Sequence, residues 1–323
     1  MSLLQKISQN KNASKPVIYG IGGAFLTDEE KFFFEKNGAL GFILFARNIE
    51  NKIQLKNLTN SLRELMGGEI LILIDQEGGR VSRLTPPDWE TYPSGKFFAE
   101  IYQKNPESAA REIFQNFAKI GHDLAEVGIN VDCAPVLDIL TTKTHKIIGD
   151  RAYGTNANQV FELGRKVCEG LLSAGIYPVI KHIPGHGRGT SDSHLELPIV
   201  DCSLEELRAA DFLPFQNLRD QKFAMTAHIL YSAIDEKFCA TFSQKTVKLI
   251  REEIGFKNIL MSDDISMKAL GGSFFDRTKL ILSAGCDLVL HCNGKMSEML
   301  EINLALQDFP QNLTDEFWER FIR

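Results

Sequence analysis

Eight short apolar segments, separated by amphipathic sequence, recur along the 323 residues of the chain. They read PVIYGIGG, LGFILFARN, ILILIDQEGG, INVDCAPVLDI, IYPVIKHIPG, KFAMTAHILY, KNILMSDDISM and CDLVLHCNG. Such nearly continuous apolar runs are typical of parallel strands that are covered on both faces. Several intervening segments, such as NQVFELGRKVCEGLLSAG, end in glycine, as helices commonly do. Eight alternating strand and helix units predict a (β/α)8 TIM-type barrel.

The sequence favours one domain. No linker rich in Pro, Gly or Ser divides the chain, and the part after the eighth run has room for only a closing helix or two. The longest irregular stretch, VSRLTPPDWETYPSG, predicts an elaborated loop over one end of the barrel. We therefore expect residues 1–323 to form a single catalytic barrel domain.

Composition narrows the function classes and the cellular location. The net charge is −6 and the pI about 5.7. This acidic balance argues against a nucleic-acid-binding protein, because binding to nucleic acid needs a basic face. The start of the chain does not resemble a signal peptide, and no apolar run is long enough to span a membrane. Six scattered cysteines without a CxxC pair indicate reduced thiols. We expect a cytoplasmic protein, with a monomer as the default.

Ionisable residues gather where the predicted strands end, which is where a barrel of this kind places its reacting groups. They are Asp75, Glu77, Asp138, Lys181, His182, His228, Asp263, Asp264 and His291. Burying them all in a structural core would cost several kcal/mol each unless they are paired. Carboxylates from the third and seventh strands should face each other across the barrel and bind a polyhydroxylated ligand. His228 and His291 fit a packing role equally well.

The segment KHIPGHGRGTSDSHLELP, residues 181–198, concentrates histidines and glycines and favours either a metal site or a mobile catalytic arm. His182 and His186 have the i, i+4 spacing of helical zinc ligands. Pro184 and Gly185 between them exclude a helix, and no cysteine completes a ligand set. We expect no metal and no cofactor.

The motifs as a set resemble one enzyme family. GFILFARN, IDQEGGRVSRL, CAPVLDI, IGDRAYG, KHIPGHG, DSHLELP, MTAHI and MSDDISM stand in the order found in bacterial β-N-acetylglucosaminidases of glycoside hydrolase family 3, the single-domain cytoplasmic type of cell-wall recycling. Ile183 stands where that family commonly has Phe, and Ala152-Tyr153 where it has Ser-Phe. The resemblance implies a retaining hydrolase that releases terminal β-linked N-acetylglucosamine, with peptidoglycan-derived muropeptides as the expected small carbohydrate partner.

The resemblance also implies roles for individual residues. Asp263 matches the catalytic nucleophile, His194 the general acid/base and Asp192 its partner. The sugar-binding positions are Asp75, Arg83, Arg151, Lys181 and His182. Charge does not separate Asp263 from Asp264; successive strand residues face opposite ways, so only one should point into the site. Two residues apart on an extended segment, Asp192 and His194 should project to one side, where the carboxylate can orient the imidazole.

The glycines of residues 181–198 should give this segment the backbone freedom of a loop that closes over bound sugar. Two alternatives stay open. A histidine in place of a carboxylate removes a charge that would repel phosphate, which would suit a glycoside phosphorylase. A barrel can also bind sugar without catalysis, because fold alone does not establish activity.

Overall fold

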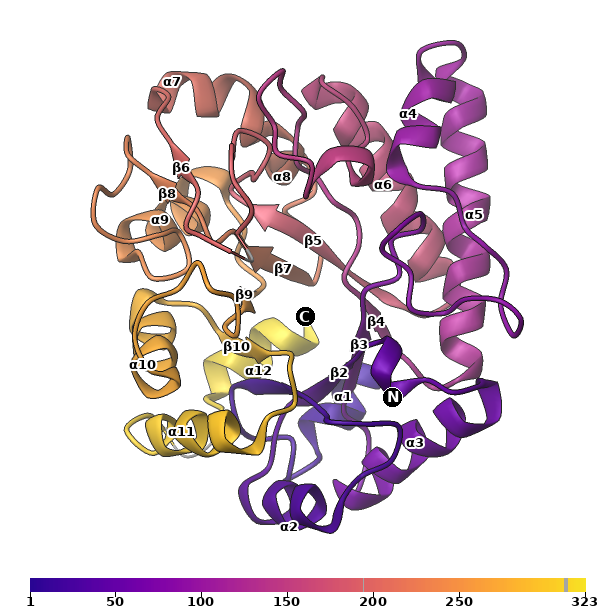
Figure 1. Ribbon diagram of the computed structural model, residues 1–323, viewed down its shortest axis with the longest axis vertical. Helices are drawn as coiled ribbons and strands as arrows, with labels where there is room; N and C mark the ends of the chain where they lie inside the picture. Colours follow the sequence, from indigo (N-terminus) through magenta and orange to yellow (C-terminus); the bar gives the residue numbers. More distant parts are fainter. Residues whose placement is uncertain (194, 311–312) are drawn as a thin grey trace.

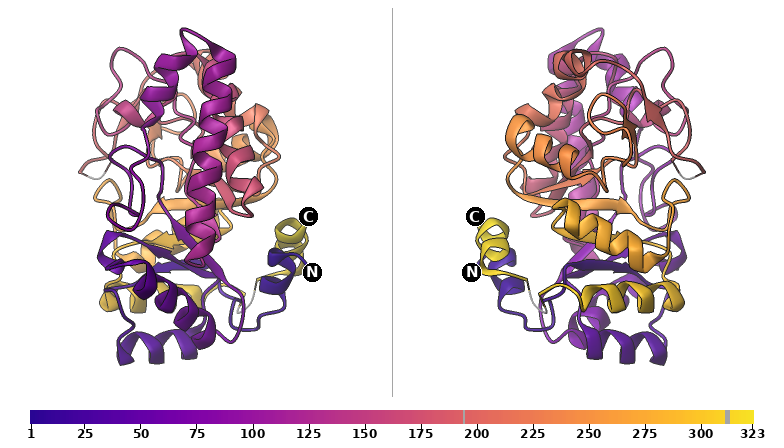
Figure 2. Two further views of the ribbon diagram at one scale, coloured as in Figure 1. Left: turned by 90° about the vertical axis from the view of Figure 1, so that its right-hand side faces the viewer. Right: turned by 90° about the vertical axis from the view of Figure 1, so that its left-hand side faces the viewer.

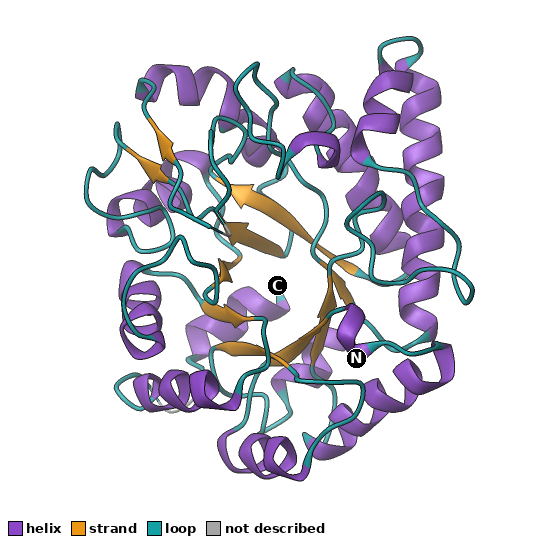
Figure 3. Ribbon diagram, viewed as in Figure 1, coloured by secondary structure: helices purple, strands orange, loops and turns teal. Residues whose placement is uncertain are grey.

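A computed structural model, which describes residues 1–193, 195–310 and 313–323, forms a closed barrel of eight parallel strands inside a ring of helices (Figures 1 and 3). The strands are β1 (Val17–Gly20), β2 (Gly41–Leu44), β3 (Leu71–Ile74), β4 (Val131–Asp132), β5 (Tyr177–Ile183), β7 (Phe223–Thr226), β9 (Ile259–Asp264) and β10 (Leu288–His291). Pairing of β1 with β10 closes the barrel. Each of the eight apolar runs contains one strand of the barrel, so the predicted (β/α)8 fold is confirmed.

The outer helices surround the barrel, and capping residues mark several of their ends. They are α2 (Asp28–Asn37), α3 (Lys52–Leu65), α4 (Gly95–Tyr102), α5 (Pro106–Glu126), α6 (Ala157–Ser173), α8 (Leu213–Asn217), α9 (Gln244–Leu249), α10 (Phe274–Ala284) and α11 (Met296–Leu306). Shorter turns are η1 (Ala46–Asn48), η2 (Gly149–Arg151), α7 (Leu204–Glu206), η3 (Leu207–Asp211) and η4 (Ile250–Ile254). Thr27 and Asn51 cap α2 and α3 by accepting backbone hydrogen bonds, and Gly285, with φ of 101°, ends α10.

Helices α1 (Leu3–Ser8) and α12 (Asp315–Ile322) pack at the end of the barrel where the strands begin, and both termini lie there (Figure 2). Arg320 Nη2 of α12 lies 2.6 Å from Asp287 Oδ1, and Lys222 Nζ donates to the Arg320 carbonyl at 3.0 Å. Asp287 and Lys222 directly precede β10 and β7, so α12 covers this end. Helices α11 and α12 are the closing helices that the sequence predicts.

Loops at the opposite end hold a feature that the sequence analysis does not predict. Two short parallel strands, β6 (Ile199–Val200) and β8 (Leu230–Tyr231), pair outside the barrel (Figure 3). They join the loop after β5 to the loop after β7. In the described part of the chain, no helix is long and apolar enough to span a membrane, and all six cysteines are free.

Candidate active site

A cavity of about 280 Å³ opens at the carboxyl ends of the strands, near the lower end of the roughly 300–1,000 Å³ typical of small-molecule sites. Its lining includes six of the eight residues singled out from the sequence: Asp75, Arg83, Arg151, Lys181, His182 and Asp263. Ser193, next to Asp192, also lines the cavity, whereas His194 lies outside the described residues. Strands β3 and β9 are four positions apart in the ring of eight, so Asp75 and Asp263 face each other across it.

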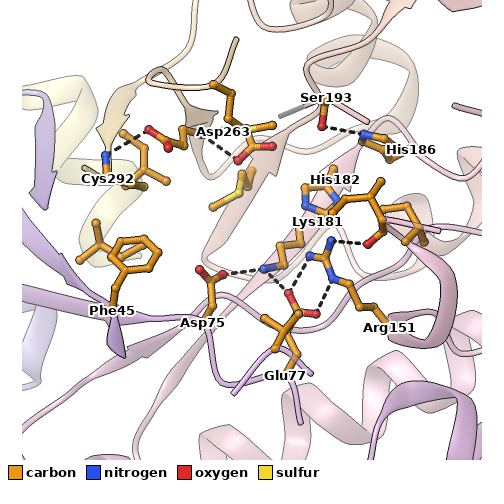
Figure 4. A pocket seen from close by; sticks show the side chains of 18 of the residues that line it. Phe45, Asp75, Glu77, Arg151, Lys181, His182, His186, Ser193, Asp263 and Cys292 are labelled. Atoms are coloured by element: carbon orange, nitrogen blue, oxygen red, sulfur yellow. Dashed lines mark hydrogen bonds and ion pairs between the residues drawn. The ribbon is translucent and has the colours of Figure 1, made fainter. Parts of the chain in front are cut away.

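A buried network of opposite charges forms the floor of the cavity (Figure 4). Lys181 Nζ lies 2.8 Å from Asp75 Oδ1 and 2.6 Å from Glu77 Oε1. Arg151 donates two hydrogen bonds of 2.7 Å to the Glu77 carboxylate. Burial alone would raise the pKa of Glu77, but the cations Arg151 and Lys181 outweigh it and hold that pKa well below its usual range. Sequence reasoning noticed Glu77 at a strand end but assigned it no role, because its two partners are distant in sequence.

Gln76 shapes the loop that returns Arg83 to the cavity, and sequence reasoning missed it. Its Oε1 accepts the backbone amides of Arg83 at 2.7 Å and Leu84 at 3.0 Å. The backbone amide of Gln76 donates a hydrogen bond to Asp132 Oδ1 at 2.9 Å. Arg83 Nη2 thereby reaches to 3.4 Å from Asp75 Oδ2. The only sequence signal was the glutamine inside IDQEGGRVSRL, a polar residue directly after a buried strand.

Both Asp263 and Asp264 border the cavity, so the lining alone does not decide which of them points into the site. Leu288 pairs with Met261 and Leu290 with Asp264, so β9 contains one extra residue at this point. Such a bulge breaks the alternation of side chains. Strand β5 has a similar shift, with Lys181 opposite Met225 and Ile183 opposite Thr226, and there Lys181 and His182 both line the cavity.

Hydrogen bonds distinguish the two aspartates. The Asp264 carboxylate accepts from Ser266 N at 2.9 Å, Ser266 Oγ at 2.5 Å and Cys292 N at 3.1 Å, which ties it to the rim. Within the described part of the chain, Asp263 accepts one hydrogen bond, 2.8 Å long, from the Asp264 amide. Burial would raise the pKa of Asp263, but His228, His182 and that amide outweigh it, so the pKa lies below its ordinary value and the carboxylate is ionised at neutral pH.

The glycines after β5 serve close packing. A Cβ on Gly187 would collide with the Ile139 carbonyl, and Gly185, with φ of 136°, lies against Asp211. His145 N donates to the Gly189 carbonyl at 3.0 Å, and Tyr231 Oη to the Gly185 carbonyl at 2.8 Å. The first part of the segment is therefore held by neighbouring loops, a role that the expectation of backbone freedom did not include.

The second part of this segment begins with backbone contacts of Asp192. Its carbonyl accepts the amides of Leu195 at 2.9 Å and Glu196 at 3.0 Å. The expectation that Asp192 and His194 project to one side of the segment involves a residue outside the described part of the chain, so it stays a prediction.

Three further histidines lie at or shortly after the strand ends: His186 lies in the cavity wall, whereas His228 and His291 pack around the barrel. His186 lines the cavity, with Nε2 3.3 Å from Ser193 Oγ, and burial lowers its pKa to about 4. His228 lies between Thr241 Oγ1 and the Asp264 carbonyl, and His291 lies 2.9 Å from Glu298 Oε2. Neither borders the cavity, so both have the packing role. Among residues 1–193, 195–310 and 313–323, no three metal-ligating side chains cluster as an ion site.

Comparison with known proteins places the chain in a family. The model of the glycosyl hydrolase family 3 N-terminal domain matches residues 18–320. A β-hexosaminidase of Bordetella avium is 34% identical over 86% of this chain and 80% of its own length. A β-hexosaminidase of Neisseria meningitidis serogroup C is 38% identical over 86% of this chain and 78% of its own.

A solved structure shares the fold closely. The crystal structure of NagZ from Neisseria gonorrhoeae in complex with N-trifluoroacetyl-D-glucosamine superimposes with a TM-score of 0.86 and 32% identity, covering 96% of this chain and 89% of that one. The family match, the identity to curated enzymes over about four-fifths of their length and the shared barrel agree. The chain belongs to glycoside hydrolase family 3 and is a glycoside hydrolase of the β-N-acetylhexosaminidase type.

Proposed function

We propose that residues 1–323 act as one catalytic domain, a retaining exo-β-N-acetylglucosaminidase with Asp263 as its nucleophile. The ionised Asp263 attacks the anomeric carbon of a terminal sugar, and the bond to the leaving oxygen breaks. Water then releases the sugar from its ester with Asp263, so configuration is retained overall. The supporting observation is the hydrogen bonding of this aspartate: it borders the cavity and, among the described residues, accepts a single hydrogen bond, whereas the neighbouring Asp264 carboxylate is tied to Ser266 and Cys292.

The proton donor in this proposal is His194, assisted by Asp192. His194 protonates the leaving oxygen and then takes a proton from the incoming water, and a free histidine titrates close enough to neutrality for both steps. The Asp192 carboxylate stabilises the imidazolium form. Support comes from Ser193, the middle residue of the DSH motif, which lines the same cavity as Asp263.

Five residues bind the sugar in this proposal: Asp75, Arg83, Arg151, Lys181 and His182. Carboxylates accept hydrogen bonds from sugar hydroxyls, while the cations donate to sugar oxygens. The small cavity, closed at its floor by the Glu77 network, suits one terminal sugar and hence an exo mode of action. The N. gonorrhoeae relative was solved with an N-acylated glucosamine, which supports the same sugar here.

We also propose that the natural substrates are muropeptides derived from peptidoglycan, cleaved in the cytoplasm by a monomeric enzyme during cell-wall recycling. This part rests on the motif resemblance. Comparing aryl β-N-acetylglucosaminide with aryl β-glucoside and aryl β-galactosaminide tests the sugar preference. A higher kcat/KM for the glucoside would reject it.

Trapping the intermediate tests the mechanism. A slow fluoro-sugar substrate followed by peptide mass mapping should place the covalent adduct on Asp263. An adduct on any other residue rejects the assignment. Incubating an aryl β-N-acetylglucosaminide with inorganic phosphate should yield free sugar; sugar-1-phosphate as the main product would make the enzyme a phosphorylase instead.

A further inference from the structure

Asp138 lies behind the cavity wall and has no role in the function proposed above. It is fully buried and does not line the cavity. Its Oδ1 accepts the backbone amides of His182 at 3.2 Å and His186 at 2.6 Å. Its Oδ2 lies 2.7 Å from Nδ1 of the His182 ring. One carboxylate thus holds both the ring of a cavity residue and the backbone that leads into the DSH segment.

The chemistry of these contacts fixes where the His182 proton lies. An ionised carboxylate only accepts hydrogen bonds, so the close contact requires a hydrogen on Nδ1. Burial would raise the pKa of Asp138, but the His182 and His186 contacts outweigh it and keep that pKa below its ordinary value. In a neutral imidazole the second nitrogen then carries a lone pair.

That second nitrogen is available to a ligand. His182 lines the cavity beside Lys181 (Figure 4), and the two nitrogens of an imidazole point away from each other. Within the described part of the chain, Nε2 of His182 has no hydrogen-bond partner, and it is not among the buried polar atoms that lack one. Because His182 lines the cavity, this nitrogen is placed to meet a ligand there.

We propose that Asp138 is a positioning residue that holds the His182 proton on Nδ1, so that Nε2 accepts a hydrogen bond from a sugar hydroxyl. Lys181, the adjacent residue, can only donate. The pair thus offers one acceptor and one donor side by side, and a hydroxyl group can satisfy both. The sugar in this inference rests on the proposed function; the position of the proton does not.

The variant Asp138→Asn tests the proton position. Its amide oxygen can still accept the two backbone amides, which leaves the amide nitrogen facing His182 Nδ1. Because that nitrogen donates, the ring must place its proton on Nε2, as in the corresponding change in a serine-protease triad. Nitrogen-15 NMR of histidine-labelled, ligand-free protein at neutral pH should show Nδ1–H for His182 in the wild type and Nε2–H in D138N. The variant His182→Ala identifies the signal among seven histidines.

A double-mutant cycle tests whether Asp138 acts through His182. With an aryl β-N-acetylglucosaminide, D138N should lower kcat/KM at least about 10-fold, because a donor then faces the sugar hydroxyl. In the H182A background the same change should cost less than about 2-fold. Asp235→Asn is a matched control, because this buried carboxylate accepts the Lys237 and Phe238 amides and the Ser243 hydroxyl away from the cavity. It should leave kcat/KM unchanged.

Two results would overturn the inference. One is a wild-type His182 that carries its proton on Nε2 or on both nitrogens. The other is a D138N effect of equal size with and without His182, which would mean that Asp138 serves only the fold. The NMR arm needs no substrate, so it decides the position of the proton even if the glycoside chosen proves to be the wrong one.

Discussion

Both ends of the barrel hold a carboxylate that bridges two cationic side chains, in different surroundings. At the open end, Glu77 lies between Lys181 and Arg151. At the closed end, Asp287 lies 2.6 Å from both Arg251 and Arg320. The three open-end residues line the cavity, whereas those at the closed end join η4 and α12 to the base of β10.

The comparison teaches that the ion network alone does not make the site. Breaking either bridge leaves buried charges unpaired, which is costly wherever it happens. Only at the open end do the same cations face a space that a sugar can enter. Substitutions at the closed end should therefore change stability alone, whereas substitutions at the open end should change both stability and catalysis.

The largest expected effect is on catalysis at the open end. Asp263→Asn should lower kcat/KM by roughly 10⁴ or more, the scale seen when a nucleophile is removed. Asp287→Asn at the closed end should leave kcat and KM unchanged. Initial rates on an aryl β-N-acetylglucosaminide check both. An Asp263→Asn enzyme within tenfold of wild type would remove the nucleophile assignment.

The next effect is on stability and should be alike at both ends. Glu77→Ala and Asp287→Ala should each lower the free energy of unfolding by about 3–5 kcal/mol, because each removes the carboxylate that two mostly buried cations share. Only the Glu77 variant should also raise KM, since Lys181 and Arg151 lose their common anchor. Urea denaturation and steady-state kinetics measure the two quantities. A raised KM in the Asp287 variant would break the comparison.

Acid should weaken the open-end network in a defined window. The pKa of Glu77 in the folded protein lies below its value in the unfolded chain, about 4.3. Its contribution is therefore fully present above that value and declines as the pH falls toward the folded pKa, by up to about 1.4 kcal/mol per pH unit. The difference in unfolding free energy between wild type and Glu77→Gln should be constant near neutrality and narrow below about pH 4. A difference that widens in acid would contradict the pairing.

The smallest effect concerns packing at the open end. Gly187→Ala places a methyl group against the Ile139 carbonyl and should cost about 1–3 kcal/mol, with a lower kcat because the start of the DSH segment shifts. Gly23→Ala is the control, since nothing lies within 4 Å of the added Cβ. Thermal unfolding and kcat would be compared. Equal behaviour of the two variants would mean that the segment adapts to the methyl group.

Sequence periodicity was sufficient for the barrel and for the ionisable strand-end residues that border its cavity, whereas Arg83 and Arg151 were predicted from the motif resemblance. Apolar runs mark strands, and a closed parallel barrel brings all their carboxyl ends together, so Asp75, Lys181 and Asp263 could be placed at one rim in advance. The site residues Asp192 and His194 remain predictions that rest on the motif resemblance.

The remainder depends on contacts between distant parts of the chain. The bulges that turn Asp264 and His182 toward the cavity arise from pairing with another strand. Position 187 needs a glycine because a side chain there would collide with the Ile139 carbonyl, which lies on a different loop. The partner of His182 is Asp138, 44 residues earlier. A local pattern does not contain this information.

Lys181 and Asp75 pair across 106 residues of the chain, which links ligand binding to folding. No short fragment contains both ends of that pair together with Asp263, so the sugar site exists only when strands from both halves of the barrel are assembled. A ligand that binds this assembled form and not the unfolded chain stabilises it by mass action. Saturation with sugar should therefore raise the melting temperature of the whole barrel as one cooperative unit.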